Sequence, residues 1–183
     1  VSVLVIASAV RHSLADGGYA ARRKNCEDAC VILGVPSLRE ATLDMLEEKK
    51  AELGDLCYRR ARHVIGENLR VAAFAEALQK GDWDAAGVAM RSSHASLKDD
   101  FEVSCAEVDT LVSLSDTIPS AASVYGARMT GGGFGGCIVA LVKSSDVEQV
   151  AQEMLEAYRN ALGIETDYLI TRPGDGARVL WQA

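Results

Sequence analysis

The 183-residue sequence lacks a long apolar run, an excess of positive charge, and cysteine or histidine pairs spaced for a metal ion. A membrane-spanning helix needs about 20 consecutive apolar residues, so we expect no membrane-embedded segment. Residues 1–6 are apolar but too few for a span, and no basic residue precedes them, which argues against a signal peptide. They predict a buried strand. The remaining composition indicates a globular protein of one domain and a little more.

Positive charge is scarce: the sequence has 19 Lys and Arg and 26 Asp and Glu, which gives a net charge of −7. Phosphate backbones attract proteins with clustered basic residues, so this balance excludes a broad nucleic-acid surface. Two short basic runs, at residues 22–24 and 59–62, lie among acidic residues in segments with helical character. We expect solvated helix faces or local ion pairs at both.

The five cysteines, at positions 26, 30, 57, 105 and 137, form no Cys-x-x-Cys pair. This spacing disfavours a disulfide framework or a zinc ribbon and favours reduced core thiols in a cytoplasmic protein. None of the three histidines has a second one at ligand spacing, so we predict no protein-only metal site. His94 is expected to be a hydrogen-bonded core residue, His63 to lie at a helix–helix contact, and His12 to end the first strand.

The periodicity of apolar residues predicts an α+β fold, with a helical layer packed on a small mixed sheet. Helices are predicted at residues 19–33 and 57–80, along the stripe from Trp83 to Leu97, and after capping-box patterns at residues 37–40, 104–107 and 145–148. Strands are predicted at residues 124–129, 137–142, 167–171 and 177–181.

The adjacent Asp99 and Asp100 do not share a helix face, so a capping or loop role is favoured over acid–base catalysis. Asp175, between two glycines, indicates a turn.

Five glycines in six positions, at residues 131–136, are the most informative local feature. Such a loop is entropically costly and is expected where the backbone approaches another group closely, or where bare N–H groups hold an anion. A dinucleotide fold needs a helix after the loop, and here a strand follows. No Gly-Lys-Ser/Thr occurs, so the loop is not a P-loop. The strand–glycine–strand order is that of the protein-kinase nucleotide lid, but the chain has no His-Arg-Asp or Asp-Phe-Gly motif. The alternative is a glycine-rich connection packed closely on a neighbouring helix.

Several motifs around this loop occur in a recognisable order. Residues 125–130 read Tyr-Gly-Ala-Arg-Met-Thr and run directly into the glycines, residues 93–97 read Ser-His-Ala-Ser-Leu, and residues 99–105 read Asp-Asp-Phe-Glu-Val-Ser-Cys. Together with residues 10–14, 19–27, 59–65 and 174–177, this order resembles the galactokinases of the GHMP small-molecule kinase superfamily. The resemblance covers nearly the whole chain, and the glycine run matches the third motif of that family.

The resemblance implies a two-domain kinase that transfers the γ-phosphoryl group of MgATP to the anomeric hydroxyl of galactose. It identifies residues 1–18 as the end of an amino-terminal, ribosomal-S5-like domain and residues 19–183 as the carboxy-terminal domain. The strand at residues 1–6 is accordingly expected to belong to the sheet of the first domain, and its bare edge would invite association. The catalytic base, the phosphate loop and most of the groups that bind ATP, Mg²⁺ and sugar are expected in the amino-terminal half, so this chain would require that domain.

The site residues that the resemblance implies in this chain are few. Tyr19 matches a tyrosine whose hydroxyl contacts the sugar, with packing between domains as the alternative. The loop glycines Gly131, Gly132, Gly133, Gly135 and Gly136 would approach the nucleotide phosphates or the substrate. Arg11 would face the cleft or, equally well, the surface. No residue of the chain is expected to be catalytic.

Two departures from the family pattern keep other functions open. Residues 7–9 read Ala-Ser-Ala where an Asn-Ser-Asn-like stretch is usual, and residues 17–20 read Gly-Gly-Tyr-Ala where Ser-Glu-Tyr-Pro is usual. These changes favour, as alternatives, an inactive sugar- and nucleotide-binding sensor or a kinase for another sugar. The first residue, Val1, is not Met, which favours a piece of a longer protein.

Overall fold

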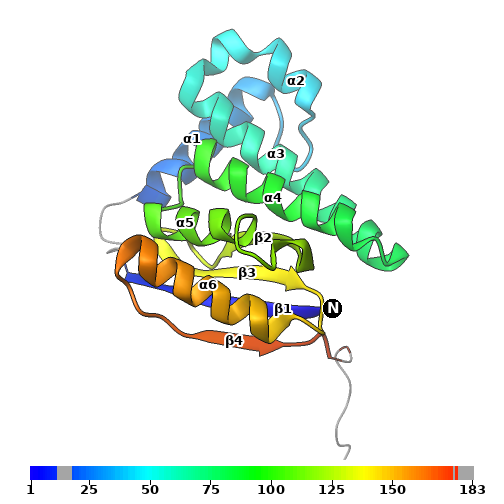
Figure 1. Ribbon diagram of the computed structural model, residues 1–183. Helices are drawn as coiled ribbons and strands as arrows, with labels where there is room; N and C mark the ends of the chain where they lie inside the picture. Colours follow the sequence, from blue (N-terminus) through cyan, green and yellow to red (C-terminus); the bar gives the residue numbers. More distant parts are fainter. Residues whose placement is uncertain (12–17, 175, 177–183) are drawn as a thin grey trace, which may run out of the picture.

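The computed structural model describes residues 1–11, 18–174 and 176, and these form two stacked parts (Figure 1). The lower part contains a four-stranded sheet with helices α5 and α6 packed on one face. The upper part contains α1, α2 and the first half of the long helix α3. Helix α4 runs between them, packing on both α3 and β2. None of the described helices combines the length and the apolar character that crossing a bilayer demands.

The sheet consists of β1 (Ser2–Arg11), β2 (Val124–Thr130), β3 (Gly135–Val142) and β4 (Tyr168–Thr171), in the order β2-β3-β1-β4. Three of these strands confirm the predictions from periodicity, and the strand at residues 1–6 is longer than expected. Each of the three pairings between the described strands is antiparallel, so the expectation of a mixed sheet was wrong in that respect. The strand predicted at residues 177–181 and the turn at Asp175 lie outside the described residues.

Strand β1 occupies the interior of this sheet. It pairs with β3 on one side and with β4 on the other, and Ile6 lies opposite both Ile138 and Tyr168. The expectation that residues 1–6 belong to the sheet of another domain, with a bare edge, is therefore wrong. The physical reason is that alternate residues of the strand, Leu4 and Ile6, are buried in the same core as β3 and α6. The predicted domain boundary after residue 18 stays a prediction for the whole protein.

The helices follow the predicted apolar periodicity closely. They are α1 (Gly18–Leu33), α2 (Leu43–Glu48), α3 (Lys50–Lys80), α4 (Trp83–Asp99), α5 (Ala106–Ser115) and α6 (Val147–Leu162), with a short 3₁₀ turn η2 (Ala121–Ser123) before β2. Gly81 ends α3 in the left-handed conformation, and the Asp82 carboxylate caps α4 by accepting from the Ala85 N–H at 2.9 Å. The predicted break at these two residues is confirmed.

The capping-box predictions were wrong in detail. Residues 37–40 form a turn, and the helix begins later, where the Thr42 hydroxyl accepts from the Met45 N–H at 3.2 Å. Helix α5 begins after Cys105 without a side-chain cap, because the Ser104 hydroxyl bonds to Asp109 instead. Helix α6 begins after Asp146, also without a side-chain cap, and that carboxylate accepts from Ser123. Ser104 thus bonds to a nearby side chain of α5 instead of a backbone N–H, and Asp146 bonds to a residue 23 positions away.

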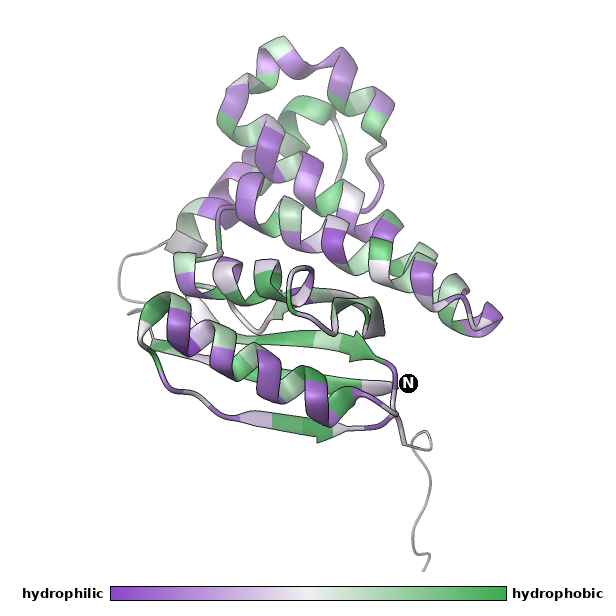
Figure 2. Ribbon diagram, in the orientation of Figure 1, coloured by the Kyte–Doolittle hydropathy of each residue, from purple (hydrophilic) through white to green (hydrophobic). Residues whose placement is uncertain are grey.

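Two main apolar cores lie in the two parts of the molecule. The larger one joins the sheet to α5 and α6 and contains Leu4, Ile138, Met154 and Tyr158, whose hydroxyl donates to the Ser8 carbonyl at 2.9 Å. The other core holds α1, α2 and α3 together around Leu46 and neighbouring residues. Figure 2 shows the result, with β1 and β3 largely hydrophobic and the helices striped by alternating hydrophilic and hydrophobic residues.

Helix α4 crosses β2 through bare backbone. A Cβ placed on Gly87 would lie 1.7 Å from the Tyr125 carbonyl oxygen, and one on Gly126 would lie 2.4 Å from the Gly87 carbonyl oxygen. Real Cβ atoms do not come so close, so both residues have to be glycine for the helix to lie on the strand. This crossing joins the helical part to the sheet and leads directly into the glycine loop.

Candidate functional site

The glycine loop connects β2 to β3 and is anchored at its centre. The Phe134 N–H donates to the Val103 carbonyl at 2.7 Å, and a Cβ on Gly133 would lie 2.5 Å from that same oxygen. Gly133 also has φ +86°, a left-handed conformation that side chains rarely adopt. The alternative of a close-packed connection is therefore correct for Gly133, although it packs on the segment after α4 rather than on a helix.

The rest of the loop is open. No atom lies within 4 Å of a Cβ placed on Gly131, and the nearest atoms to Gly132 and Gly136 are at 3.6 and 3.7 Å. Packing therefore does not require glycine at these three positions, although the backbone conformation favours it at Gly131 and Gly136, with φ +88° and +89°. A backbone kept bare in open space is the arrangement that lets a ligand approach main-chain N–H groups.

Tyr19 lies against this open part, as the second residue of α1. Its hydroxyl donates to the Gly132 carbonyl, and its ring meets Phe134 edge-on with the ring centroids 6.0 Å apart. The side chain is 46% exposed. The structure thus brings together two groups that the sequence singled out separately, although they are 113 positions apart, and it leaves the phenol accessible.

Arg22, one turn further along α1, was missed as a site residue. It was assigned to a solvated basic run, yet its guanidinium donates to the carbonyls of Phe101 at 2.6 Å, Gly18 at 2.8 Å and Glu102. It also lies over the Phe134 ring, 5.1 Å from the centroid. Burial, followed by the nearby Arg60 charge, lowers the pKa of Arg22 from its ordinary value. No local feature distinguishes Arg22 from the neighbouring Arg23, which pairs with Glu27 at the surface as predicted.

The segment at residues 100–103, which holds Gly133 in place, is itself held by α3. Arg60, only 4% exposed, donates to the Asp100 carbonyl and to the Glu102 carboxylate at 2.5 Å, and Arg59 donates to the same carboxylate. These hydrogen bonds lower the pKa of Glu102 to about 2. Glu102 adopts φ +53°, which is unusual for a side-chain-bearing residue. The prediction of solvated faces was therefore wrong for Arg60.

The histidines within the described residues have structural roles, as predicted. His63 joins α3 to α4 through a 3.0 Å hydrogen bond with Ser96 and stacks on Phe101, and burial lowers its pKa to about 4. His94 accepts from the Met129 N–H at 3.3 Å, and burial lowers its pKa despite the nearby Asp109 carboxylate. His12 lies outside the described residues.

Asp100 follows the end of α4, as its predicted capping or loop role required, and accepts from Ser96 and Arg62. Arg11 ends β1 with its backbone opposite Gly135, and the role of its side chain in the cleft stays a prediction.

The five cysteines are free and half-buried rather than fully in the core. Over residues 1–11, 18–174 and 176, no group of three His, Cys, Asp or Glu side chains is placed to hold a metal ion.

Strands β2 and β3, the glycine loop between them, helices α4 and α5 and most of α6 lie within a region that matches a known family. A family model described as "GHMP kinases C terminal" matches residues 74–160. The chain is 48% identical over 179 residues to galactokinases of Bos taurus and Canis lupus familiaris, covering 98% of the chain and 44% of each relative. The crystal structure of Lactococcus lactis galactokinase complexed with galactose matches with a TM-score of 0.86 and 30% identity, over 96% of this chain and 46% of that one.

The chain therefore contains a GHMP kinase C-terminal domain, and it is a homologue of the carboxy-terminal part of the galactokinases. It spans less than half the length of the curated relatives that it matches.

Proposed function

We propose that the whole protein is a galactokinase, which transfers the γ-phosphoryl group of ATP to the anomeric hydroxyl of galactose, and that this chain forms one wall of its active site. The observation that carries the proposal is the contact between Tyr19 and Gly132, which joins an accessible phenol to an open glycine loop. The identity with galactokinases over 98% of the chain supports the choice of reaction.

In this proposal the two elements have different tasks. The Tyr19 hydroxyl both donates and accepts hydrogen bonds, which suits a sugar hydroxyl, and the loop presents bare main-chain groups on the side of the phosphates. Phosphoryl transfer depends mainly on positioning and on neutralising charge. By resemblance to the galactokinases, the ligands of the MgATP metal, the phosphate loop and the base would come from the amino-terminal domain. The chain alone would be inactive, and we place the whole protein in the cytoplasm.

The test is a substrate profile of the protein expressed from its complete coding frame. ADP release is measured with galactose, N-acetylgalactosamine and arabinose at equal concentrations, and sugar 1-phosphate is identified by mass. Turnover with galactose at least tenfold above the other two sugars supports the proposal. A clear preference for another sugar would make the protein a different GHMP kinase, and no turnover with any of the three sugars would overturn the proposed reaction.

A second candidate is a sugar- and nucleotide-binding sensor without turnover. The altered residues before Tyr19 favour it, among them Ala9, which lacks the side-chain amide that the galactokinase pattern usually has at this position. Saturable binding of galactose and ATP by calorimetry, without ADP release, would identify the sensor. Turnover by the same preparation would remove it.

A further inference from the structure

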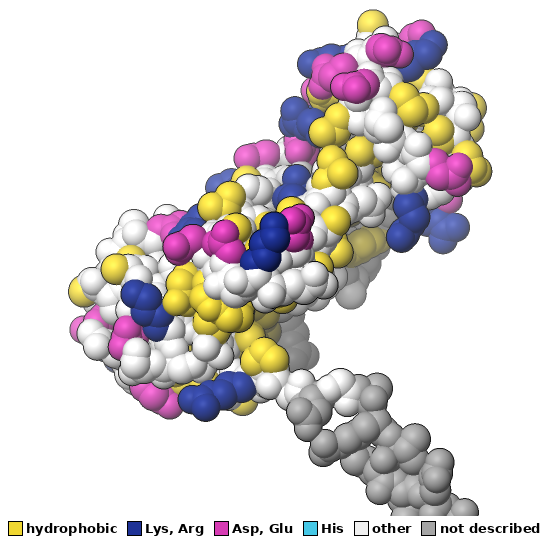
Figure 3. Space-filling model, turned by 90° about the vertical axis from the view of Figure 1, so that its right-hand side faces the viewer, with side chains coloured by type: hydrophobic (Ala, Val, Ile, Leu, Met, Phe, Trp, Pro, Cys, Tyr) yellow, Lys and Arg dark blue, Asp and Glu magenta, His cyan; other side chains and the backbone are white. Residues whose placement is uncertain are grey.

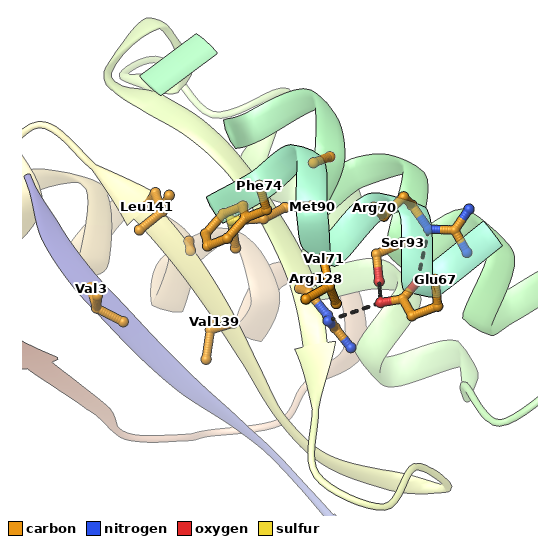
Figure 4. A pocket seen from close by; sticks show the side chains of 12 residues that line it. Val3, Glu67, Arg70, Val71, Phe74, Met90, Ser93, Arg128, Val139 and Leu141 are labelled. Carbon is orange, nitrogen blue, oxygen red and sulfur yellow. Dashed lines mark hydrogen bonds and ion pairs between the residues drawn. The ribbon is translucent and has the colours of Figure 1, made fainter. Parts of the chain in front are cut away.

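The arginines of this chain differ in the groups that they bind. Figure 3 shows one face of the molecule, on which Lys and Arg side chains lie beside Asp and Glu side chains. At the cavity shown in Figure 4, Arg70 and Arg128 share the Glu67 carboxylate at 2.7 and 3.3 Å. Arg22 is different, because each of its three side-chain nitrogen atoms donates to a backbone carbonyl. A guanidinium bonded in this way fixes main-chain segments relative to one another, since its donors lie in a rigid plane.

The carbonyls that Arg22 joins belong to two segments that are far apart in the sequence. Its Nη1 donates to Gly18 at 2.8 Å, at the first residue of α1 and directly before Tyr19. Its Nε donates to Phe101 at 2.6 Å and its Nη2 donates to Glu102, which are 79 and 80 positions away. These two residues belong to the segment after α4 that also anchors the glycine loop. Arg22 therefore ties the first turn of α1 to the support of that loop.

The guanidinium also contacts the loop itself, through Phe134. The central carbon of the guanidinium lies 5.1 Å from the Phe134 ring centroid, and the Tyr19 ring meets the same ring edge-on at 6.0 Å. A Cβ placed on Gly18 would lie 3.1 Å from Arg22 Nη1 and 3.3 Å from the Phe134 ring, so these groups are closely packed. Phe134 thus contacts both side chains beside the point where the Tyr19 hydroxyl reaches the Gly132 carbonyl.

Local structure alone holds Tyr19 weakly. The first turn of a helix has no intrahelical partners for its N–H groups, and residues 19–21 are exposed. The first turn of α1 also has no acidic residue to interact with the helix dipole. That dipole disfavours a positive charge so near the start of a helix, so the contribution of Arg22 comes from its hydrogen bonds and its ring contact.

We propose that Arg22 is a positioning residue for the sugar, which acts by holding the Tyr19 hydroxyl at the glycine loop. This inference rests on the proposed function, in which Tyr19 contacts galactose. Positioning of this kind matters because a displacement of about 1 Å can cost about a hundredfold in rate. Arg22 itself touches neither the sugar nor the phosphates in this proposal.

A lysine at position 22 would keep the charge and lose the geometry. Its ammonium group is one compact donor on a flexible chain, whereas the guanidinium reaches three carbonyls at once. Arg22→Lys therefore separates the position of the donors from their charge. Arg23→Lys is the matched control, because Arg23 pairs with Glu27 at 2.8 Å and its side chain is 83% exposed.

The first test measures steady-state kinetics of the protein expressed from its complete coding frame. We expect Arg22→Lys to raise KM for galactose at least about fivefold and to change KM for ATP by less than about twofold. Arg23→Lys is expected to keep both constants within about twofold of the wild type, because an exposed ion pair contributes little. Arg22→Gln, which keeps one side-chain amide donor, replaces Arg22→Lys in each comparison if that variant does not fold.

The second test is a double-mutant cycle with Tyr19→Phe. If Arg22 acts through the Tyr19 hydroxyl, Arg22→Lys raises KM for galactose by less than about twofold in the Tyr19→Phe background, because the contact that it positions is already lost. A general structural role would give the same increase in both backgrounds and would overturn the inference.

The possible outcomes separate this inference from the proposed function. Galactose turnover in the wild type, with an unchanged KM for galactose in Arg22→Lys, would overturn the role of Arg22 and leave the function intact. If the wild type binds galactose without turnover, the proposed function fails, and the same variants compared by galactose calorimetry still test Arg22. Absence of galactose binding to the wild type would overturn both.

Discussion

Glycine is used in two different ways within 50 residues of this chain. At the crossing of α4 and β2, Gly87 and Gly126 are required because backbone atoms occupy the space that any side chain would need. In the loop at residues 131–136, Gly133 is packed in this way, whereas a Cβ on Gly131 would meet nothing within 4 Å and one on Gly132 or Gly136 would make only ordinary contacts. Gly87, Gly126 and Gly133 allow close packing of the fold, and Gly131, Gly132 and Gly136 leave the surface of the loop without side chains. Mutations that add a single methyl group can separate the two uses.

Gly87→Ala is expected to have the largest effect. The new Cβ would overlap the Tyr125 carbonyl oxygen, and neither helix nor strand can shift without losing the other's contacts. We expect a loss of at least about 3 kcal/mol in the free energy of unfolding, or no folded protein. Gly66→Ala in α3 is the control, because its Cβ would meet only the flexible end of Arg70, and alanine favours helix by about 0.5–1 kcal/mol. Equal stability of the two variants in urea would refute the packing role of Gly87.

Gly133→Ala tests the anchored part of the loop. The φ of +86° and the 2.5 Å approach to the Val103 oxygen together predict a loss of about 2–4 kcal/mol, smaller than at Gly87 because a loop can relax. Chemical denaturation measures the loss. A decrease below about 0.5 kcal/mol would show that the loop is not held by this contact.

Tyr19→Phe tests the open part of the loop from the side of α1. Removing the hydroxyl is expected to weaken galactose binding by about 1–3 kcal/mol, the range for a lost buried polar partner. Because the phenol is exposed and the ring contact with Phe134 remains, stability is expected to fall by less than about 1 kcal/mol. Steady-state kinetics of the whole protein measure the Michaelis constant for galactose, and an unchanged value would exclude Tyr19 as a sugar contact.

Ala9→Gly tests the opposite change, because it introduces a glycine at a position with positive φ where the chain has alanine. Ala9 is exposed and adopts φ +56°, so relief of backbone strain is expected to raise stability by about 0.5–1 kcal/mol. Thermal denaturation of the variant and of the wild type measures the difference. A destabilised variant would mean that the Ala9 methyl group makes a contact worth more than the strain.

Gly132→Ala is expected to have the smallest effect on stability, within about 0.5 kcal/mol. Its φ is not in the left-handed region, and the nearest atom to the new Cβ would be the Tyr19 hydroxyl at 3.6 Å. If the loop faces the substrate, turnover with galactose is nevertheless expected to fall. Unchanged stability with unchanged kinetics would leave this glycine without a role in the proposed site.

Much of the fold was predictable because its determinants are local. The stripe of α4 and the apolar strands on either side of the glycine loop follow from side-chain periodicity alone. The partners of β1 did not follow, because the pairing of Ile6 with Ile138 and Tyr168 depends on residues more than 130 positions away. The capping box at Ser104 failed for a different reason, because its hydroxyl bonds to the side chain of Asp109, five positions away, rather than to a backbone N–H.

In the candidate site, too, some residues could be identified from the sequence and others only from the fold. Tyr19 and the glycines were identified through resemblance to a family, and the glycines also through their cost in chain entropy. Arg22 and Arg60 were not identified, because an arginine in a basic run looks the same in sequence whether it pairs at the surface or is buried against carbonyl groups. Nothing in the sequence around residues 102 and 103 indicates that this segment fixes Gly133.

The interior position of β1 has a consequence for biosynthesis. The strand is synthesised before every other described element, yet its neighbours are β3 and β4, and Ser2 pairs with Val142. At translation rates of about 5–20 residues per second, β1 waits on the order of ten seconds for its first partner to be made. During that time an apolar segment with two unpaired edges is available to other nascent chains. Contacts of such high sequence separation slow folding, so the yield of this protein in a cell is expected to depend on chaperones and on growth temperature.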